Sequence, residues 1–393
     1  MYFLVSRTLV YLRRLLRLPQ VQAVVGNIVT VGRAIVTGLG TLLFFWIQNN
    51  NDDISFCQLS RANTMTDRIF SLSVGNRYEL LLRDRLHVCE NMFLLCDGGD
   101  TVFKTTCQRD GTFHPPLPTS NCRVPLKPSI QQIVDSSCEH TMIRVGFRFG
   151  STFMELYRNC YDIKTATAHF SINKVYPIYM SSDRPLTGFD RDNIISAADA
   201  DSFQNKNIYQ RFKALLGPRQ PYIASIKSSS FDRGHLTPVG DYFFPRIMKQ
   251  TNKYINVVPQ YYSINRGNWK TVETWIRKTV KEVQDDVLNV CTGALGVLEL
   301  SNNNQQPTQI YLVPSKIRVP RWTYKIIRSD TTYRKYVILT SNNGWETYRP
   351  NSSSVCQEVA CPLSLYTTAT GYTFCCDPTE FIRRNVPKLA GVC

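Results

Sequence analysis

The chain has 393 residues, of which 43% are hydrophobic and 19% charged, so it is long enough for a large core or for two to three domains. This composition excludes a disordered chain. The net charge of +16 favours polyanionic partners, either nucleic acid or an anionic membrane surface. Residues 1–51 contain five arginines and no acidic residue, so a chain processed there would keep a net charge of about +11 and stay basic.

The first fifty residues predict a targeting segment. An arginine-rich start is followed by an apolar run of fourteen residues, Ala34–Ile47. This length suits a signal peptide better than a membrane span, which needs about 20 residues. We therefore expect residues 1–50 to be a secretory signal. A signal anchor is one alternative, because no small-residue cleavage site follows Ile47. A mitochondrial presequence is another, because the segment is rich in arginine and free of acids.

Thirteen cysteines predict disulfide bonds and an oxidising compartment, which favours a secreted protein over a mitochondrial one. No CxxC pair occurs, and the five histidines do not complete a zinc spacing. Because the count is odd, one thiol is left over. The two candidates are a buried Cys291 and a Cys57 that is linked elsewhere.

Residues 51–135 predict a small, disulfide-stapled β module with an accessory role. Short apolar runs such as Tyr78–Leu82 alternate with turn signals such as the proline cluster Pro115–Pro118. The four cysteines from Cys89 to Cys122 are enough for two bridges.

Residues 136–393 predict a second, sheet-rich domain with one cysteine-stapled extension at its C-terminal end. In Met142–Phe149 the residues alternate with the period of a strand and place Arg144 and Arg148 on one face. His169 lies in a predicted strand, and we expect it to be a packed sheet residue and not a ligand. A short helix is expected over Tyr209–Leu216. Further strands are expected over Phe153–Tyr157, Thr165–Ile172, Val287–Gly293, Gln309–Pro314, Arg321–Ile327 and Tyr336–Thr340.

The tetrapeptide Asp-Arg-Gly-His at Asp232–His235 carries groups that phosphodiester hydrolysis needs. His235 is a candidate general base, because the intrinsic pKa of histidine lies near neutrality. Arg233 would share a strand face with His235, and its guanidinium matches phosphate oxygens. Asp232 is a candidate to orient His235 or a neighbouring arginine. So short a motif is weak evidence by itself.

The stretch that begins at Asn265 strengthens this interpretation. Val272, Ile276, Val280 and Val283 recur at nearly helical spacing, so a helix is expected to begin near Asn265. The side-chain oxygen of Asn265 is a hard ligand that suits Mg²⁺.

Two further residues of this helix, Glu273 and Arg277, stand four residues apart and would face the same side. The simpler interpretation is that Asn265 caps the helix and that Glu273 and Arg277 form an ordinary helix pair. Their occurrence together behind Asp232–His235 favours a catalytic role.

Three segments, Asp232–Pro238, Asn256–Gln260 and Asn265–Glu273, resemble the motifs of the DNA/RNA non-specific endonuclease family, the ββα-metal nucleases. The resemblance extends over residues 136–345. It implies an α+β fold with a ββα-metal core on a central, mostly antiparallel sheet, beside the small disulfide-rich N-terminal β module.

The same resemblance implies an Mg²⁺-dependent hydrolase, with Mn²⁺ as a second candidate ion, that cleaves DNA or RNA to products with a 5′-phosphate. It makes His235 the general base and Asn265 the metal ligand, and it lets Glu273 hold a metal-bound water. Arg233 and Arg277 would act on the phosphate or the transition state, Asn256 would support the site, and Asp232 matches the motif with a less defined role. The alternative is a catalytically silent nucleic-acid-binding protein on the same scaffold.

Overall fold

The computed structural model describes residues 56–97, 102–185, 187–228, 230–363, 365 and 370–393. Within them, Phe56–Cys393 forms one compact unit. The predicted targeting segment lies outside the described residues. No helix in the described ranges is long and apolar enough to cross a membrane.

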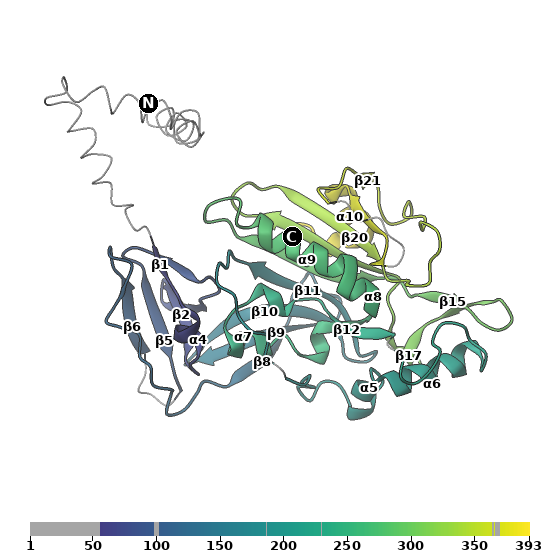
Figure 1. Ribbon diagram of the computed structural model, residues 1–393, viewed down its shortest axis with the longest axis horizontal. Coiled ribbons are helices and arrows are strands. Elements are labelled where there is room, and N and C mark those ends of the chain that lie inside the picture. Colours follow the sequence, from purple (N-terminus) through teal and green to yellow (C-terminus); the bar gives the residue numbers. More distant parts are fainter. Residues whose placement is uncertain (1–55, 98–101, 186, 229, 364, 366–369) are drawn as a thin grey trace, which may run out of the picture. The chain divides into compact units, whose positions relative to one another are not determined.

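A nine-stranded sheet runs through this unit, and every neighbouring pair in it is antiparallel (Figure 1). The expected mixed fold with a central antiparallel sheet is therefore confirmed. The strand of this sheet that comes first along the chain, β8 (Pro128–Ile133), lies within residues 51–135, the range that we predicted for the accessory module. In spatial order the strands are β21 (Glu358–Val359), β22 (Thr373–Cys376), β20 (Lys335–Ser341), β19 (Trp322–Ser329), β14 (Leu288–Leu295), β11 (Thr167–Val175), β10 (Thr152–Asp162), β9 (Thr141–Phe149) and β8 (Pro128–Ile133).

The two faces of this sheet are covered by different helices. Ile326 and Ile327 are neighbours on β19, so their side chains point to opposite faces. Ile327 packs in one cluster with Val272 and Ile276 of α9 (Lys270–Thr279). Ile326 packs in another cluster with Phe381 of α10 (Pro378–Asn385). We call these the α9 face and the α10 face.

Residues 56–114 form a second, five-stranded sheet together with a short strand pair. In order, the sheet contains β3 (Arg77–Leu80), β2 (Ile69–Val74), β5 (Asn91–Leu95), β6 (Val102–Cys107) and β7 (Phe113–His114). The separate pair is β1 (Phe56–Gln58) with β4 (Arg85–His87), and α4 (Arg61–Thr64) lies between β1 and β2.

This N-terminal sheet packs closely on the rest of the unit. The rings of Phe70 and Phe244 lie 4.6 Å apart between centroids. The buried carboxylate of Asp84 accepts backbone hydrogen bonds from Tyr179 at 2.7 Å and Met180 at 2.6 Å. The two parts share one hydrophobic cluster.

Six disulfides cross-link the described residues. The prediction that either Cys57 or Cys291 has no partner within the chain is wrong. Both candidates are bonded: Cys57 to Cys107, and Cys291 to Cys393. The exposed Cys89 is the free cysteine. The four cysteines from Cys89 to Cys122 are enough for two bridges, but only Cys96–Cys122 closes within this group. The reason is that pairing requires Cα atoms about 4.4–6.8 Å apart, which strand pairing and not sequence spacing decides. The remaining bridges are Cys138–Cys160, Cys356–Cys376 and Cys361–Cys375.

The remaining elements connect the sheets and surround the predicted site. The helix expected over Tyr209–Leu216 is longer and begins at Asn205. These elements are α5 (Ala197–Asp201), α6 (Asn205–Leu216), β12 (Phe231–His235), η2 (Val239–Asp241), α7 (Pro245–Lys249), η3 (Tyr254–Asn256), β13 (Val257–Tyr261), α8 (Tyr262–Ile264), η4 (Asn265–Trp269), β15 (Glu299–Ser301), β16 (Pro307–Gln309), β17 (Tyr311–Val313), β18 (Lys316–Arg318) and η6 (Pro387–Leu389).

Candidate active site

Two strands and a helix bring the predicted residues together. β12 pairs antiparallel with β13, and His235 lies opposite Val257. A Cβ on Gly234 would lie 2.6 Å from Cβ of Gln260, so glycine lets the two strands pair this closely. The chain then passes through α8 and η4 into α9.

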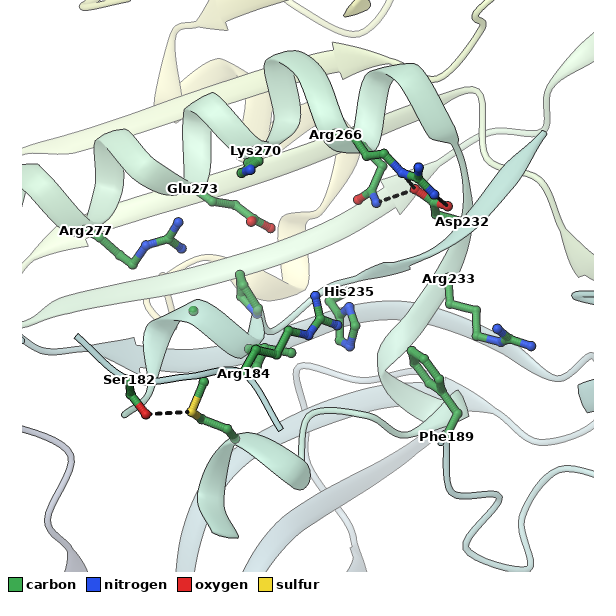
Figure 2. Close-up of a pocket in the computed structure, with 15 residues that line it drawn as sticks. Ser182, Arg184, Phe189, Asp232, Arg233, His235, Arg266, Lys270, Glu273 and Arg277 are labelled. Atoms are coloured by element: carbon green, nitrogen blue, oxygen red, sulfur yellow. Dashed lines mark hydrogen bonds and ion pairs between the residues drawn. The ribbon is translucent and has the colours of Figure 1, made fainter. Parts of the chain in front are cut away.

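A cavity of about 670 Å³ opens where β12, η4 and α9 meet (Figure 2). Six of the seven predicted residues line it, and Asn256 does not. The six are Asp232, Arg233, His235, Asn265, Glu273 and Arg277.

The imidazole of His235 is held as a neutral base. Its Nε2 lies 2.9 Å from Oδ1 of Asn252, whose Nδ2 donates to Oγ1 of Thr187 at 2.9 Å. Because that amide oxygen accepts, Nε2 carries the proton and Nδ1 is the basic nitrogen. Burial lowers the pKa of His235 to about 4, an effect that the hydrogen bond to Asn252 partly opposes. At neutral pH the ring is therefore neutral, with one proton on Nε2 and none on Nδ1.

Asp232 orients Asn265 and does not contact His235 in the described hydrogen bonds. Its Oδ2 accepts from Nδ2 of Asn265 at 2.9 Å and from Nε of Arg266 at 2.9 Å. A second bond from Arg266, to Oδ1 at 2.8 Å, makes that pair bidentate. With its amide nitrogen held by Asp232, Asn265 has its amide oxygen left to act as a ligand.

Asn265 does not cap a helix as in the simpler interpretation. It begins a π-helical turn, Asn265–Trp269, which follows directly on α8, and α9 follows it in turn. Gly267 has non-helical backbone angles inside this turn, and a Cβ there would lie 2.7 Å from Thr370. The turn is a local break in the helix, of the kind that often occurs at functional sites. The helix is also shorter than expected, since α9 ends at Thr279.

Glu273 on α9 faces the same cavity, and it is not paired with Arg277 in the described contacts. Burial raises the pKa of Glu273 to about 7, while the positive charge of Lys325 acts in the opposite direction. Lys325 itself is completely buried on β19. Its Nζ donates to Oγ1 of Thr292 at 2.7 Å and lies 5.0 Å from the ring of Trp269. A buried ammonium without a carboxylate in direct contact is costly, so it favours ionised acids nearby.

The two predicted arginines differ in their surroundings. Arg277 is held by Asp241, with Nη1 3.2 Å from Oδ1. The guanidinium of Arg233 lies 5.1 Å from the ring of Phe189, which Figure 2 shows near it, and 5.5 Å from the ring of Tyr254. Arg233 thus combines a place at the cavity wall with aromatic packing.

Asn256 lies outside the cavity lining and hydrogen-bonds to the backbone next to it. It is completely buried. Its Oδ1 accepts from the N–H of Thr237 at 2.9 Å, and its Nδ2 donates to the carbonyls of Thr237 and Thr251, both at 2.9 Å. Asn256 therefore fixes the backbone two residues beyond His235.

Three basic residues at the cavity were not singled out from the sequence. Arg266 and Lys270 lie inside the Asn265–Glu273 motif, so the motif itself was the available signal. Arg184 comes from a loop without periodicity or motif, and its side chain extends beside His235 (Figure 2). The lining holds five cations against two carboxylates, which suits a polyanion. The cations are Arg184, Arg233, Arg266, Lys270 and Arg277.

The chain is similar in sequence to proteins that are named as nucleases. A family model described as DNA/RNA non-specific endonuclease matches residues 138–381. The salivary endonuclease of Lutzomyia longipalpis is 32% identical over 252 residues, which are 62% of this chain and 60% of that protein. The mitochondrial nuclease EXOG of Mus musculus is 26% identical over 147 residues, which are 36% of this chain and 38% of that protein.

Nuclease C1 of Cunninghamella echinulata var. echinulata is 28% identical over 133 residues, covering 33% of this chain and 52% of that protein. The chain thus spans less than two thirds of the length of each of these three relatives. A chain in the crystal structure of the EndoG/EndoGI complex superposes with a TM-score of 0.37 and 21% identity, over 60% of this chain and 82% of that one.

The family match covers more than half of the chain and contains all seven predicted site residues. This chain belongs to the DNA/RNA non-specific endonuclease family.

Proposed function

We propose that this protein is an Mg²⁺-dependent, sugar-non-specific endonuclease that hydrolyses DNA or RNA and leaves 5′-phosphate ends. The observation that carries the proposal is the convergence of a neutral His235, an oriented Asn265 and the carboxylate of Glu273 on one basic cavity. A binding protein needs the basic lining, but it does not need a base and an oriented metal ligand held beside each other.

The donor set fits the proposed ion. Asn265 offers an amide oxygen whose orientation Asp232 fixes, and Glu273, on the next turns of the same helical segment, would hold a water bound to the ion. Hard oxygen donors in small number are what Mg²⁺ prefers, because it keeps several waters. When bound, the ion would neutralise charge that develops on the phosphate and the leaving oxygen.

The residues of the chain supply the rest of the chemistry. His235 is neutral at pH 7, so its Nδ1 can take a proton from the attacking water. Arg277, kept in place by Asp241, presents its guanidinium to the cavity and can bind phosphate oxygens as negative charge grows on them. Arg184, Arg266 and Lys270 line the same cavity and can hold the flanking backbone.

Cleavage of defined polymers tests this function. Purified protein is incubated with plasmid DNA, single-stranded DNA and double-stranded RNA, with Mg²⁺ and with EDTA. We expect cleavage that depends on the metal ion. We also expect the His235→Ala variant to cleave about 10²–10⁴-fold more slowly than the unchanged protein, because this is the usual contribution of a general base. His114→Ala is the matched control, because His114 is exposed on β7 and should not affect the rate. Salt-sensitive binding of these polymers without turnover would contradict the proposal and favour the silent binding protein.

We also propose that the protein acts outside the cytosol, as a secreted protein. Support comes from the six disulfides, since such bonds are rare where thiols are kept reduced. Native protein from its source should migrate differently on reducing and non-reducing gels. Identical migration would contradict an oxidising location.

A further inference from the structure

Three metal-ligating side chains meet in a second place, on the α10 face. The candidate ligand atoms of His140, Asp162 and His169 all lie within 4.8 Å of one another. Nδ1 of His140 is 3.9 Å from Oδ2 of Asp162, and the two imidazole rings stack with centroids 4.3 Å apart. We propose that these three residues form a binding site for a transition-metal ion of the Zn²⁺ type, separate from the nuclease site.

A sheet irregularity directs His169 into this cluster. In the pairing of β10 with β11, Cys160 lies opposite Phe170 and Tyr161 lies opposite Ala168. His169 is therefore the extra residue of a β-bulge, a feature that typically redirects a side chain. The disulfide between Cys138 and Cys160 holds the segment before β9, and with it His140, beside the bulge.

The carboxylate of Asp162 is oriented by its own turn. Its Oδ1 accepts the backbone N–H of Lys164 at 2.9 Å, and its Oδ2 accepts the hydroxyl of Thr165 at 2.7 Å. A carboxylate has about four acceptor positions, so Oδ2 retains capacity for a cation. Hydrogen bonds of this kind are what hold ligating carboxylates in metal sites.

The donor set favours a transition metal over Mg²⁺. Two imidazole nitrogens and one carboxylate oxygen suit Zn²⁺, whereas Mg²⁺ prefers oxygen donors alone. Bonds of about 2.0–2.1 Å in a tetrahedron place ligand atoms about 3.4 Å apart, so separations of up to 4.8 Å must shorten by as much as about 1.4 Å. His140 is exposed, so its side chain has the freedom to make this movement.

Arg318 opposes the ion and so sets its affinity. Its Nη2 lies 3.4 Å from Nδ1 of His169 and donates to the carbonyl of Ala294 at 3.1 Å. A metal-bound imidazole normally donates a hydrogen bond from its second ring nitrogen. The guanidinium of Arg318 has no acceptor atom, so it cannot receive that hydrogen bond from His169. Loading the site therefore requires the long contact between Arg318 and His169 to open, so removal of Arg318 should tighten binding.

The site is independent of the proposed nuclease function. It opens into a cavity of about 280 Å³ that is lined by Tyr324 of the α10-face cluster and by Asn385 and Lys388 near the end of α10. The nuclease cavity is lined from α9, on the other face. Three protein ligands leave a fourth position open to water or to an external ligand from this cavity.

Zn²⁺ binding by the full-length protein tests the site. The background is Asn265→Ala with Cys89→Ser, which removes the proposed active-site ligand and the exposed thiol. We expect equilibrium dialysis with metal analysis to find one Zn²⁺ per chain, and the thermal unfolding midpoint to rise with Zn²⁺ but not with Mg²⁺.

Single ligand variants decide the assignment. His140→Ala and His169→Ala should each weaken binding at least tenfold, His114→Ala should not, and Arg318→Leu should strengthen it. Circular dichroism checks that each variant folds, and His140→Ala is the safest because the residue is exposed. No stoichiometric Zn²⁺ binding, or binding that both histidine variants keep, would overturn the proposal. Neither result would contradict the proposed nuclease function, because cleavage of nucleic acid is measured in a separate assay.

Discussion

Asn256→Ala tests whether the support behind His235 matters for both stability and catalysis. The change removes three hydrogen bonds of 2.9 Å in a completely buried position and leaves backbone groups of Thr237 and Thr251 without these partners. At about 1 kcal/mol for each bond, the free energy of unfolding should fall by about 3 kcal/mol. The loss should be larger if the backbone groups of Thr237 and Thr251 find no new partner. Since Thr237 lies two residues beyond His235, a shift of about 1 Å there should also lower kcat about 10²-fold.

Asn342→Ala is a matched control, because its side chain makes the same kind of contacts elsewhere. It is also completely buried. Its Oδ1 accepts from the N–H of Tyr261 at 2.8 Å, and its Nδ2 donates to the carbonyls of Pro259 and Pro320, both at 3.0 Å. The loss of stability should therefore be similar, without a comparable loss of kcat.

Urea unfolding followed by tryptophan fluorescence measures the first effect, and cleavage at a temperature where both variants are folded measures the second. A loss below 1 kcal/mol for Asn256→Ala would refute the hydrogen-bond argument. Equal losses of kcat in the two variants would refute the specific link between Asn256 and His235.

Three further variants or treatments test other parts of the site and fold. Lys325→Met removes the positive charge that favours ionised Glu273, so the pKa of Glu273 should rise above about 7. The acidic limb of the pH profile of kcat/KM should then move to higher pH. An acidic limb at the same pH would contradict this coupling. Arg184→Ala should weaken polymer binding and reduce the salt slope by about 1, whereas an unchanged slope would mean that Arg184 does not contact phosphate. Alkylation of unreduced, folded protein should label only Cys89, and peptide mapping that finds another labelled cysteine would contradict the disulfide assignment.

Much of the geometry of the candidate site was predictable because its information is local. The strand period places residues on β12, and α9 brings Glu273 and Arg277 to one side, so the motifs alone predicted that these residues would meet. Six of the seven predicted residues do line one cavity. Their chemical roles stay predictions that the proposed experiments address.

Other features depend on contacts between residues far apart in the sequence, which no spacing rule supplies. The partners of Cys57 and Cys291 follow from which strands and termini lie side by side, so the sequence-based expectation for the unpaired thiol failed. Arg184 reaches the cavity from a loop without a motif.

The tetrapeptide around His235 predicted a base and its phosphate-binding neighbours, because those are properties of the side chains themselves. Only the tertiary structure decided their protonation and orientation. Burial lowers the pKa of His235, Asn252 turns its basic nitrogen, and Asp232 holds Asn265 instead of the histidine. The physical reason is that solvation and hydrogen-bond partners come from whatever the fold places next to a residue.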